Sequence, residues 1–290
     1  MINIDVTDDF DLKKIAESGQ CFRWQPIEND GYRIIHGEYT LCIWKKSKNL
    51  SERDALYEDT DKYESDDSVY MLDCTEEEYR DIWSVYLDMD ENYKSIRDRI
   101  DAVCDPFLFE AAGHEKGIRI LRQDPWEALV SFIISQNRNI PAIKASIEKL
   151  AMRAGEKKTD SRGEEYYTFP TPQKIASMSA EALAECKLGY RDKYVRQVAE
   201  SVVNGEIDLD RIDVGTDEEV LANLTSIYGV GKKVASCMLL FGFHHLNAFP
   251  VDVWIKRVLE TEYKGNYPFD NYSPYNGVYQ QYMFAYYRNR

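Results

Sequence analysis

Hydrophobic and polar residues alternate between Phe22 and Trp44, where aromatic and β-branched residues recur at every second position around a turn at 29–31. This period of two predicts antiparallel strands. Beyond residue 75 the apolar residues recur every three to four positions instead, which predicts helices. The predicted helices span 76–87, 92–103, 126–135, 140–154, 172–178, 180–186, 191–204, 217–226, 232–243 and 253–260. The polar segment 155–165 predicts a loop.

The order of these elements predicts an α+β fold, with a small antiparallel sheet packed on a mostly helical body. A length of 290 residues allows one large or two modest domains with a sizeable core. We divide the chain into an N-terminal domain, 1–110, which holds the sheet and an acidic helical extension, and a helical domain, 111–290.

The net charge of −15 is distributed unevenly. Residues 1–110 hold 13 Lys plus Arg and 28 Asp plus Glu, whereas residues 111–290 hold 23 of each. Phosphate would repel the densest acidic segment, 51–98, so we expect it to be a solvated face turned away from any nucleic acid. The balanced second part of the chain leaves a DNA contact open.

The spacing of the cysteines and the hydropathy of the chain argue against a zinc protein and against a membrane protein. Six cysteines are dispersed without a Cys-x-x-Cys pair, which argues against a zinc site and suits a reducing compartment. No segment approaches 18 apolar residues, and the N-terminus lacks a basic flank followed by an apolar stretch. We therefore expect a soluble chain without a targeting segment.

Gly229 and Gly231 flank one apolar residue between two predicted helices. Glycines permit positive φ and close approach of another backbone, and the free N–H groups that open the second helix can face an anion. Phosphate is a natural occupant of such a site. An ordinary corner between two helices would use the same glycines, so the hairpin alone does not decide the function.

Two lysines in the first turn of the second helix favour a catalytic interpretation, because the helix dipole prefers acids there. An amine that is partly out of water loses its proton more easily, and a neutral amine can form a Schiff base with a sugar carbon. Lys233 is the predicted nucleophile and shares a helix face with Cys237. Lys232 lies on a neighbouring face, where it would bind a phosphate.

Asp252 precedes the predicted helix 253–260, where an N-cap aspartate accepts hydrogen bonds from its own helix. A capping carboxylate is held rigid and ionised. It is therefore also suited to stabilise the positive charge that develops on a sugar when a glycosidic bond breaks.

Six ordered blocks extend this pattern over most of the chain. They are 18–24, 121–127, 131–140, 188–195, the hairpin with Pro-Val-Asp-Val at 250–253, and 277–284. In these blocks the sequence resembles the helix-hairpin-helix DNA glycosylases, and specifically the 8-oxoguanine DNA glycosylases. The resemblance implies base-excision repair of duplex DNA that contains oxidised guanine, with a Schiff base through Lys233, an associated lyase activity and no cofactor. No cysteine follows Cys237, so the iron–sulfur cluster of some relatives is not expected.

The resemblance also implies a base pocket. Oxidation at C8 turns N7 of guanine from an acceptor into a donor, and the carbonyl of Gly19 would accept from it. Cys237 and Phe284 would sandwich the flipped base, and Gln280 would bond its pairing edge. From the residues alone, Gly19 reads as a turn glycine, Gln280 as a surface residue, and Phe284 as part of an aromatic cluster at 275–287.

On the DNA side, the resemblance assigns Asn137 to the hole left by the flipped base. Tyr190 and Arg191 would contact the DNA around that hole, and Gly229, Gly231 and Lys232 would bind its backbone. We expect a monomer on double-stranded DNA, because a single lesion offers no two-fold target. The lack of a targeting segment or basic localisation cluster predicts the cytoplasm of a bacterium or archaeon, in association with the nucleoid.

Three positions depart from the family pattern. Relatives often read the orphaned cytosine with two arginines; Arg191 matches one of them, but Ala142 stands at the other position, so discrimination for cytosine should weaken. Trp254 replaces a frequent histidine, which puts a phosphate contact there in doubt. Residues 227–228 read Ile-Tyr instead of Leu-Pro, which should leave the hairpin geometry unaffected.

Two other functions remain open. A monofunctional alkylated-base glycosylase of the same fold would use Asp252 with water and would not need Lys233. A non-catalytic helix-hairpin-helix protein that only grips DNA would explain the glycines and Lys232, but would leave Asp252, Gln280 and Phe284 without a joint purpose.

Overall fold

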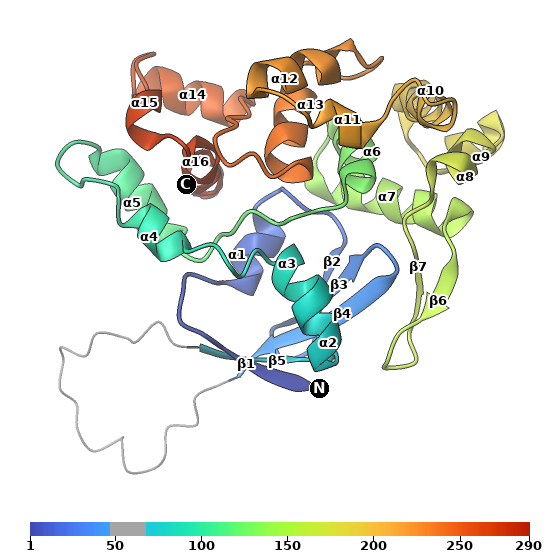
Figure 1. The fold of residues 1–290 in the computed structure, drawn as a ribbon, viewed down its shortest axis with the longest axis horizontal. Coiled ribbons are helices and arrows are strands. Elements are labelled where there is room, and N and C mark those ends of the chain that lie inside the picture. The colour runs from blue at the N-terminus through green and yellow to red at the C-terminus, as the bar shows by residue number, and fades with distance from the viewer. Residues whose placement is uncertain (47–67) are drawn as a thin grey trace.

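A five-stranded antiparallel sheet forms one end of the molecule, and helices form most of the rest (Figure 1). This computed structural model describes residues 1–46 and 68–290. The strand order is β1-β5-β4-β3-β2, and the predicted α+β fold is confirmed. The strands are β1 (Ile2–Val6), β2 (Trp24–Ile27), β3 (Gly31–His36), β4 (Tyr39–Lys45) and β5 (Ser68–Leu72).

The strands predicted in 22–44 are β2, β3 and β4, joined by two tight turns. Their alternation places Ile34, Leu41 and Ile43 on a buried face. Helices close that face, with Ile15 of one and Trp83 of another in the same apolar cluster. Helices of the sheet region are α1 (Leu12–Glu17), α2 (Glu76–Glu78), the π-helical turn η2 (Tyr79–Trp83), α3 (Ser84–Tyr86) and α4 (Tyr93–Arg97).

The prediction of a helix over 76–87 is confirmed, because α2, η2 and α3 follow one another without a break. The prediction over 92–103 is wrong beyond Arg97. There the carboxylate of Asp101 accepts the backbone N–H groups of Val103 and Cys104 at 2.7 and 3.1 Å. These local bonds compete with helical ones and turn the chain. Of the acidic segment 51–98, residues 51–67 lie outside the described residues.

The helical body follows along the chain. It comprises α5 (Pro106–His114), α6 (Pro125–Ser135), α7 (Ile140–Ala154), α8 (Pro172–Ala176), α9 (Ala180–Glu185), η3 (Gly189–Arg191), α10 (Asp192–Val203), α11 (Leu209–Ile212), α12 (Asp217–Ser226), α13 (Lys232–Cys237), η4 (Met238–Gly242), α14 (Val253–Thr261), α15 (Phe269–Tyr272) and α16 (Asn276–Asn289). The helices predicted here all occur, with ends that shift by a few residues.

The loop predicted at 155–165 is instead part of a hairpin of two short strands, β6 (Lys157–Thr159) and β7 (Glu165–Tyr167). Asp160 forms its turn by accepting the backbone N–H groups of residues 162 and 164. Asp160 also pairs with Arg33 of the large sheet at 2.8 Å. A long-range ion pair therefore holds a polar segment whose sequence shows no strand pattern.

The sheet and the helical body are fastened together by residues 20–23. Phe22 belongs to the apolar core of the helices, and the buried Arg23 donates to Glu148 of α7 at 2.8 Å. Gln20 donates to the carbonyl of Arg119 at 2.8 Å and accepts from the N–H of Leu121. These contacts fix the loop that carries Gly19 against the helices.

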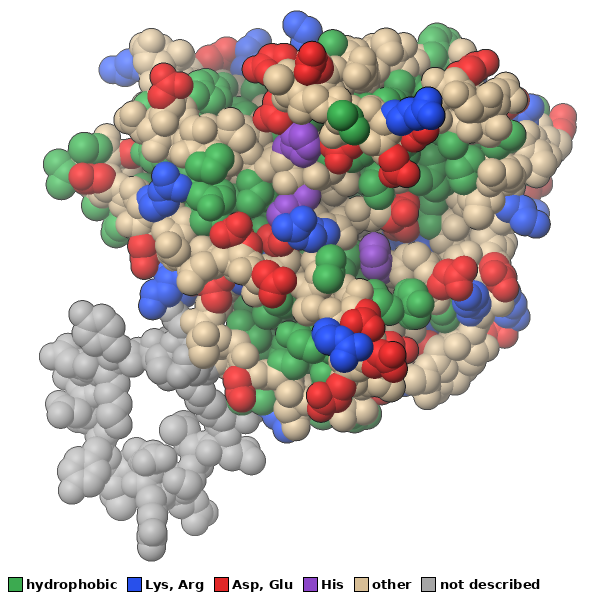
Figure 2. Space-filling model, in the orientation of Figure 1, with side chains coloured by type: hydrophobic (Ala, Val, Ile, Leu, Met, Phe, Trp, Pro, Cys, Tyr) green, Lys and Arg blue, Asp and Glu red, His purple; other side chains and the backbone are tan. Residues whose placement is uncertain are grey.

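Charged side chains of both signs are interspersed over the face in Figure 2, and acidic ones gather around α2 at its lower edge. Within the described ranges, 1–46 and 68–290, no helix has the length and apolar character needed to cross a bilayer.

Candidate active site

A cavity of about 1180 Å³ opens in the helical body, beside the loop that carries Gly19. Its lining comes from the Gly19 loop, the α6–α7 connection, α13, the segment before α14, and α16. Seven of the residues selected from the sequence line it: Gly19, Asn137, Tyr190, Gly231, Lys233, Asp252 and Phe284. Segments separated by more than 200 positions therefore meet at one site.

The hairpin before α13 depends on one glycine for its shape. Gly229 has φ +85°, and a Cβ built there would lie 2.6 Å from Cγ of Tyr194. Gln136 of the α6–α7 connection donates to the Gly229 carbonyl at 2.9 Å. Gly231 precedes α13 and has no side chain to cap it. Contacts with Tyr194 and Gln136 therefore fix the hairpin, and the start of α13 lines the cavity through Gly231 and Lys233.

Lys233 is exposed in the first turn of α13. Its Nζ lies 5.5 Å from the ring centroid of Phe132, which gives the ammonium a cation–π contact on one side. The removal from water expected from the sequence is therefore confined to the side that Phe132 covers. Phe132 was not selected from the sequence, because it reads as an ordinary core residue of α6.

Asp252 is the N-cap of α14, as predicted. Its Oδ1 accepts from the N–H groups of Trp254 and Ile255, each at 2.9 Å. Trp254 itself lines the cavity, and the guanidinium of Arg257 lies 5.2 Å from its ring centroid. The cap fixes the direction of a carboxylate that is only partly exposed.

Cys237 lies four residues after Lys233 and is buried. Burial raises the pKa of the Cys237 thiol, although the nearby Lys233 opposes the shift. At neutral pH the sulfur is therefore a neutral thiol that offers an apolar surface.

Gln280 is 3% exposed in α16, so it is not a surface residue. Its Nε2 donates to the carbonyl of Pro250 at 3.0 Å, two residues before Asp252. Its Oε1 is buried and finds no hydrogen-bond partner within residues 1–46 and 68–290. A buried acceptor without a donor is costly, so this oxygen is suited to bind a ligand N–H.

Gly19 adopts φ +81° and faces Phe284. A Cβ built on Gly19 would lie 3.4 Å from Cε1 of the Phe284 ring. The positive φ favours glycine at this position, whereas a Cβ would make only an ordinary contact with the ring. The two residues thus form one wall of the cavity, although 264 positions separate them along the sequence.

The α6–α7 connection presents Asn137, which is exposed and has φ +52°. Arg191 is buried and donates to the carbonyl of Gln136 at 2.8 Å and to that of Leu188 at 3.1 Å. The ring of Tyr190, 51% exposed, lies 4.3 Å from the Arg191 guanidinium. Arg191 therefore holds the Asn137 loop in place, a role that the sequence did not indicate.

The other residues selected from the sequence do not line this cavity; they are Cys237, Gln280, Arg191, Gly229 and Lys232. Lys232 is exposed beside Lys233, and Ala142 is half-buried in the first turn of α7. Arg288 lines the cavity but was not selected from the sequence. Its position four residues after Phe284 is the signal that places both on one face of α16.

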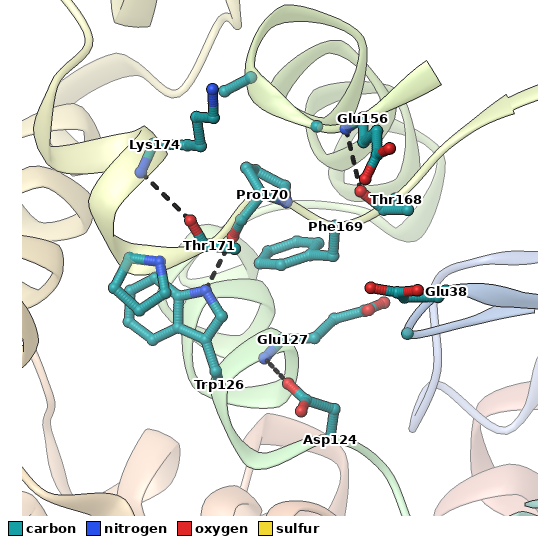
Figure 3. A pocket seen from close by; sticks show the side chains of 14 residues that line it. Glu38, Asp124, Trp126, Glu127, Glu156, Thr168, Phe169, Pro170, Thr171 and Lys174 are labelled. Atoms are coloured by element: carbon teal, nitrogen blue, oxygen red, sulfur yellow. Dashed lines mark hydrogen bonds between the residues drawn. The ribbon is translucent and has the colours of Figure 1, made fainter. Parts of the chain in front are cut away.

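A second cavity, of about 590 Å³, lies among the β3–β4 turn and the starts of α6 and α8 (Figure 3). Trp126 donates to the carbonyl of Pro170 at 2.9 Å across it. Burial raises the pKa of Glu127 to about 7, although Arg23 opposes the shift. None of the residues selected from the sequence lines this cavity.

In the part of the chain that the structure describes, no group of His, Cys, Asp and Glu side chains is placed to hold a metal ion.

Two family models together match most of the chain. The 8-oxoguanine DNA glycosylase N-terminal domain matches residues 1–129, and the HhH-GPD superfamily of base excision DNA repair proteins matches residues 130–265. A curated relative, the N-glycosylase/DNA lyase of Saccharomyces cerevisiae, is 30% identical over 87% of this chain and 68% of its own length. A probable N-glycosylase/DNA lyase of Methanothermobacter thermautotrophicus is 27% identical over 89% and 84%.

Solved structures agree with this assignment. The 8-oxoguanine glycosylase/lyase of Clostridium acetobutylicum, bound to duplex DNA with cytosine opposite 8-oxoguanine, is 33% identical with a TM-score of 0.83, covering 100% of this chain and 98% of that one. MBOgg1 with a low affinity DNA ligand is 35% identical with a TM-score of 0.85, covering 99% and 95%. The chain therefore belongs to the 8-oxoguanine DNA glycosylase family, within the HhH-GPD superfamily of base excision DNA repair proteins.

Proposed function

We propose that this protein excises 8-oxoguanine from double-stranded DNA and then cleaves the strand at the abasic site. The observation that carries the proposal is that Lys233 and Asp252 line one cavity with Gly19 and Phe284. An amine, a fixed carboxylate and an aromatic wall are the groups that Schiff-base removal of a flipped base requires. The relatives named N-glycosylase/DNA lyase support the same pair of activities.

The flipped base is held by three kinds of contact. The Gly19 carbonyl accepts from N7–H of the oxidised base, and it would repel the N7 lone pair of normal guanine. Phe284 and the neutral thiol of Cys237 cover the two faces of the base. The partnerless Oε1 of Gln280 accepts from the pairing edge, where guanine carries its N1–H and N2–H donors.

The chemical step uses Lys233 as nucleophile. Neutral Nζ forms a bond to C1′ while the C1′–N9 bond breaks, and the base leaves with the electron pair and takes up the proton released by the amine. Asp252, fixed by its two N–H contacts, stabilises the positive charge that develops on the sugar. Opening of the sugar ring gives the Schiff base. Loss of a C2′ proton then expels the 3′ phosphate, and no cofactor takes part.

The DNA-binding residues surround the cavity. Asn137 occupies the hole beside the orphaned base, Tyr190 lies against the neighbouring step, and Arg191 positions that loop. The hairpin at 229–232 binds the phosphate backbone through Gly229, Gly231 and Lys232. We further propose that the protein acts as a monomer, in the cytoplasm and associated with the nucleoid, and that it consists of two domains, 1–110 and 111–290.

Borohydride trapping tests the proposal. The substrate is a duplex with a single 8-oxoguanine opposite cytosine, compared with the same duplex carrying guanine. At saturating protein, we expect a covalent adduct with the lesion only and complete loss of the adduct in Lys233→Gln. Lys232→Gln, which removes a phosphate contact but keeps the nucleophile, should still form the adduct under these conditions.

Each other result has a defined meaning. Base release without trapping by the intact protein would favour a monofunctional glycosylase, in which Asp252 activates water. The 3-methyladenine DNA-glycosylase of Archaeoglobus fulgidus shares this fold with a TM-score of 0.72 at 17% identity, covering 99% of this chain and 98% of that one. If the protein bound DNA but neither released the base nor formed a covalent adduct, it would be a non-catalytic DNA-binding protein.

A further inference from the structure

Arg288 lines the cavity together with three other cations, Lys233, Arg138 and Lys256, and the chemistry described above does not use it. It lies on α16, one helical turn beyond Phe284, and it lines the same cavity as Lys233 and Asp252. The guanidinium group of arginine is planar and positively charged, and it donates hydrogen bonds in fixed directions. An arginine beside a base pocket can therefore recognise one edge of the base.

Two contacts fix the orientation of the Arg288 side chain. Its Nη2 donates to the carbonyl of Glu17 at 2.7 Å, and its guanidinium carbon lies 5.2 Å from the ring centroid of Phe284. The guanidinium is therefore held between the Gly19 loop and the aromatic wall of the pocket. Little side-chain freedom remains to be lost when a ligand binds.

The other terminal nitrogen has no acceptor. Nη1 of Arg288 is buried and makes no hydrogen bond to any residue in the described ranges. Burial lowers the pKa of Arg288, while the carboxylates of Glu17, Glu115 and Asp252 oppose the shift. A charged donor held out of water without a partner costs free energy, so the position favours a ligand that brings an acceptor.

The location of Nη1 identifies that acceptor. Nη1 lies 3.8 Å from the point where a Cβ on Gly19 would be. Gly19 is the residue assigned to N7 of the flipped base, and two carbonyl oxygens, O6 and O8, lie on either side of N7 in 8-oxoguanine. A donor beside Gly19 therefore faces the edge of the base that carries an oxo group.

We propose that Arg288 recognises the flipped base by donating from Nη1 to the purine oxo group next to N7. This inference rests on the proposed function of the same cavity. When the C1′–N9 bond breaks, the departing base gains negative charge that spreads onto its oxygens. The hydrogen bond from a cation then strengthens, so Arg288 increases the rate of excision as well as lesion binding.

The test compares Arg288→Met with Arg290→Met. Arg290 lies at the end of the same helix, 57% exposed and 4.0 Å from Glu262, and it does not line the cavity. Single-turnover excision of 8-oxoguanine opposite cytosine should fall roughly 10- to 100-fold in Arg288→Met. It should be unchanged in Arg290→Met and partly restored in Arg288→Lys, which keeps the charge.

Cleavage of a duplex with a preformed abasic site is the control, because it shows whether the variant is folded and whether its Lys233 still reacts. No base is present there, so strand cleavage by Arg288→Met should match that of the intact protein. Binding of a duplex with 8-oxoadenine, which keeps O8 but replaces O6 with an amine, separates the two oxygens. Weaker binding by Arg288→Met assigns the contact to O8, and unchanged binding assigns it to O6.

Equal excision rates for the intact protein and Arg288→Met would overturn the proposal. So would equal losses on 8-oxoguanine and on the abasic site, because they would indicate a purely architectural role. Failure of the intact protein to excise or trap would instead refute the proposed function, which the borohydride experiment detects separately.

Discussion

Gly229 and Gly231 are two positions apart in the hairpin, yet only Gly229 is required by the backbone. Gly229 has φ +85° and leaves no room for a Cβ beside Tyr194, whereas a Cβ on Gly231 would meet nothing within 4 Å. The sequence suggested both glycines for the same reason. The difference depends on Tyr194 of α10, which a local pattern does not bring to the hairpin.

Gly229→Ala should therefore lower the free energy of unfolding by roughly 1–3 kcal/mol, because it combines a strained φ with a clash. Gly231→Ala should stay within about 1 kcal/mol of the intact protein, since alanine is a poorer N-cap but fits the space. Urea unfolding without DNA measures both. Similar losses in the two variants would contradict the asymmetry.

Cysteine accessibility gives a second prediction at this scale. Cys104 is exposed, whereas the other five cysteines are buried, and burial raises the pKa of Cys21 to about 12 and of Cys74 to about 11. One thiol should react with a disulfide reagent in the folded protein and six in denaturant. Cys104→Ser should abolish the fast reaction. A second fast thiol assigned to Cys237 would show that the core around α13 opens to the reagent.

The sequence located a site residue most directly where its side chain also has a recognisable structural role, such as capping a helix. Asp252 is both a helix cap and a cavity residue, so the capping pattern located it. Gln280 was selected through the family resemblance alone, and Arg288 was not selected, although it lies four residues after Phe284. Their importance comes from a buried oxygen and a buried nitrogen that no described residue satisfies.

Among the elements, α16 shows why periodicity alone was insufficient. Residues 276–283 are buried on all sides of this helix, so apolar and polar positions do not separate into two faces. Two members of the aromatic cluster at 275–287, Tyr279 and Tyr282, are buried in the core. The partly buried Phe284, one turn from Arg288, instead lines the cavity. The division of the chain at residue 110 stays a prediction.

His245 fastens the start of α12 to the segment that leads to Asp252. Its ring nitrogens lie 2.6 Å from Asp217 and 2.9 Å from Asp213. Burial favours the neutral ring, but the hydrogen bonds to these two carboxylates outweigh it and raise the pKa of His245. The stabilisation is fully present below the ordinary value of 6.5 and is lost as pH rises through the raised pKa.

His245→Gln should therefore destabilise the protein by about 0.5–1 kcal/mol at pH 6, since the pair is partly exposed. The difference from the intact protein should shrink by pH 9. Thermal unfolding across this range measures it, and His114→Gln, at an exposed histidine outside the cluster, is the control. A difference that grows with pH would contradict the sign of the shift.

Over the whole molecule, the acidic residues are concentrated in one region, whereas the region that carries most of the cavity has a balanced charge. The acid excess lies in residues 1–110, and acidic side chains gather around α2 of the sheet region, whereas α13 lies at the other end of the view (Figures 1 and 2). Overall composition alone argued against DNA. The distribution along the chain was readable from the sequence, but the distance between α2 and the cavity required the fold.

Salt dependence tests this separation. If Lys232 contacts a phosphate, Lys232→Gln should reduce the slope of log affinity against log salt by about 1. Glu77→Gln, which neutralises an exposed acid in α2, should leave the slope unchanged. Fluorescence anisotropy with an 8-oxoguanine duplex at several salt concentrations measures both. A change caused by Glu77→Gln would place α2 near the DNA.

The hydrogen bond from Arg288 to Glu17 joins residues 271 positions apart. A ribosome that has translated past Asp252 has already made Lys233 and Asp252, the two side chains proposed to react, but the wall formed by Phe284 and Arg288 does not exist until α16 emerges. The growing chain therefore cannot hold a base between Gly19 and Phe284 before residues 276–289 have been made.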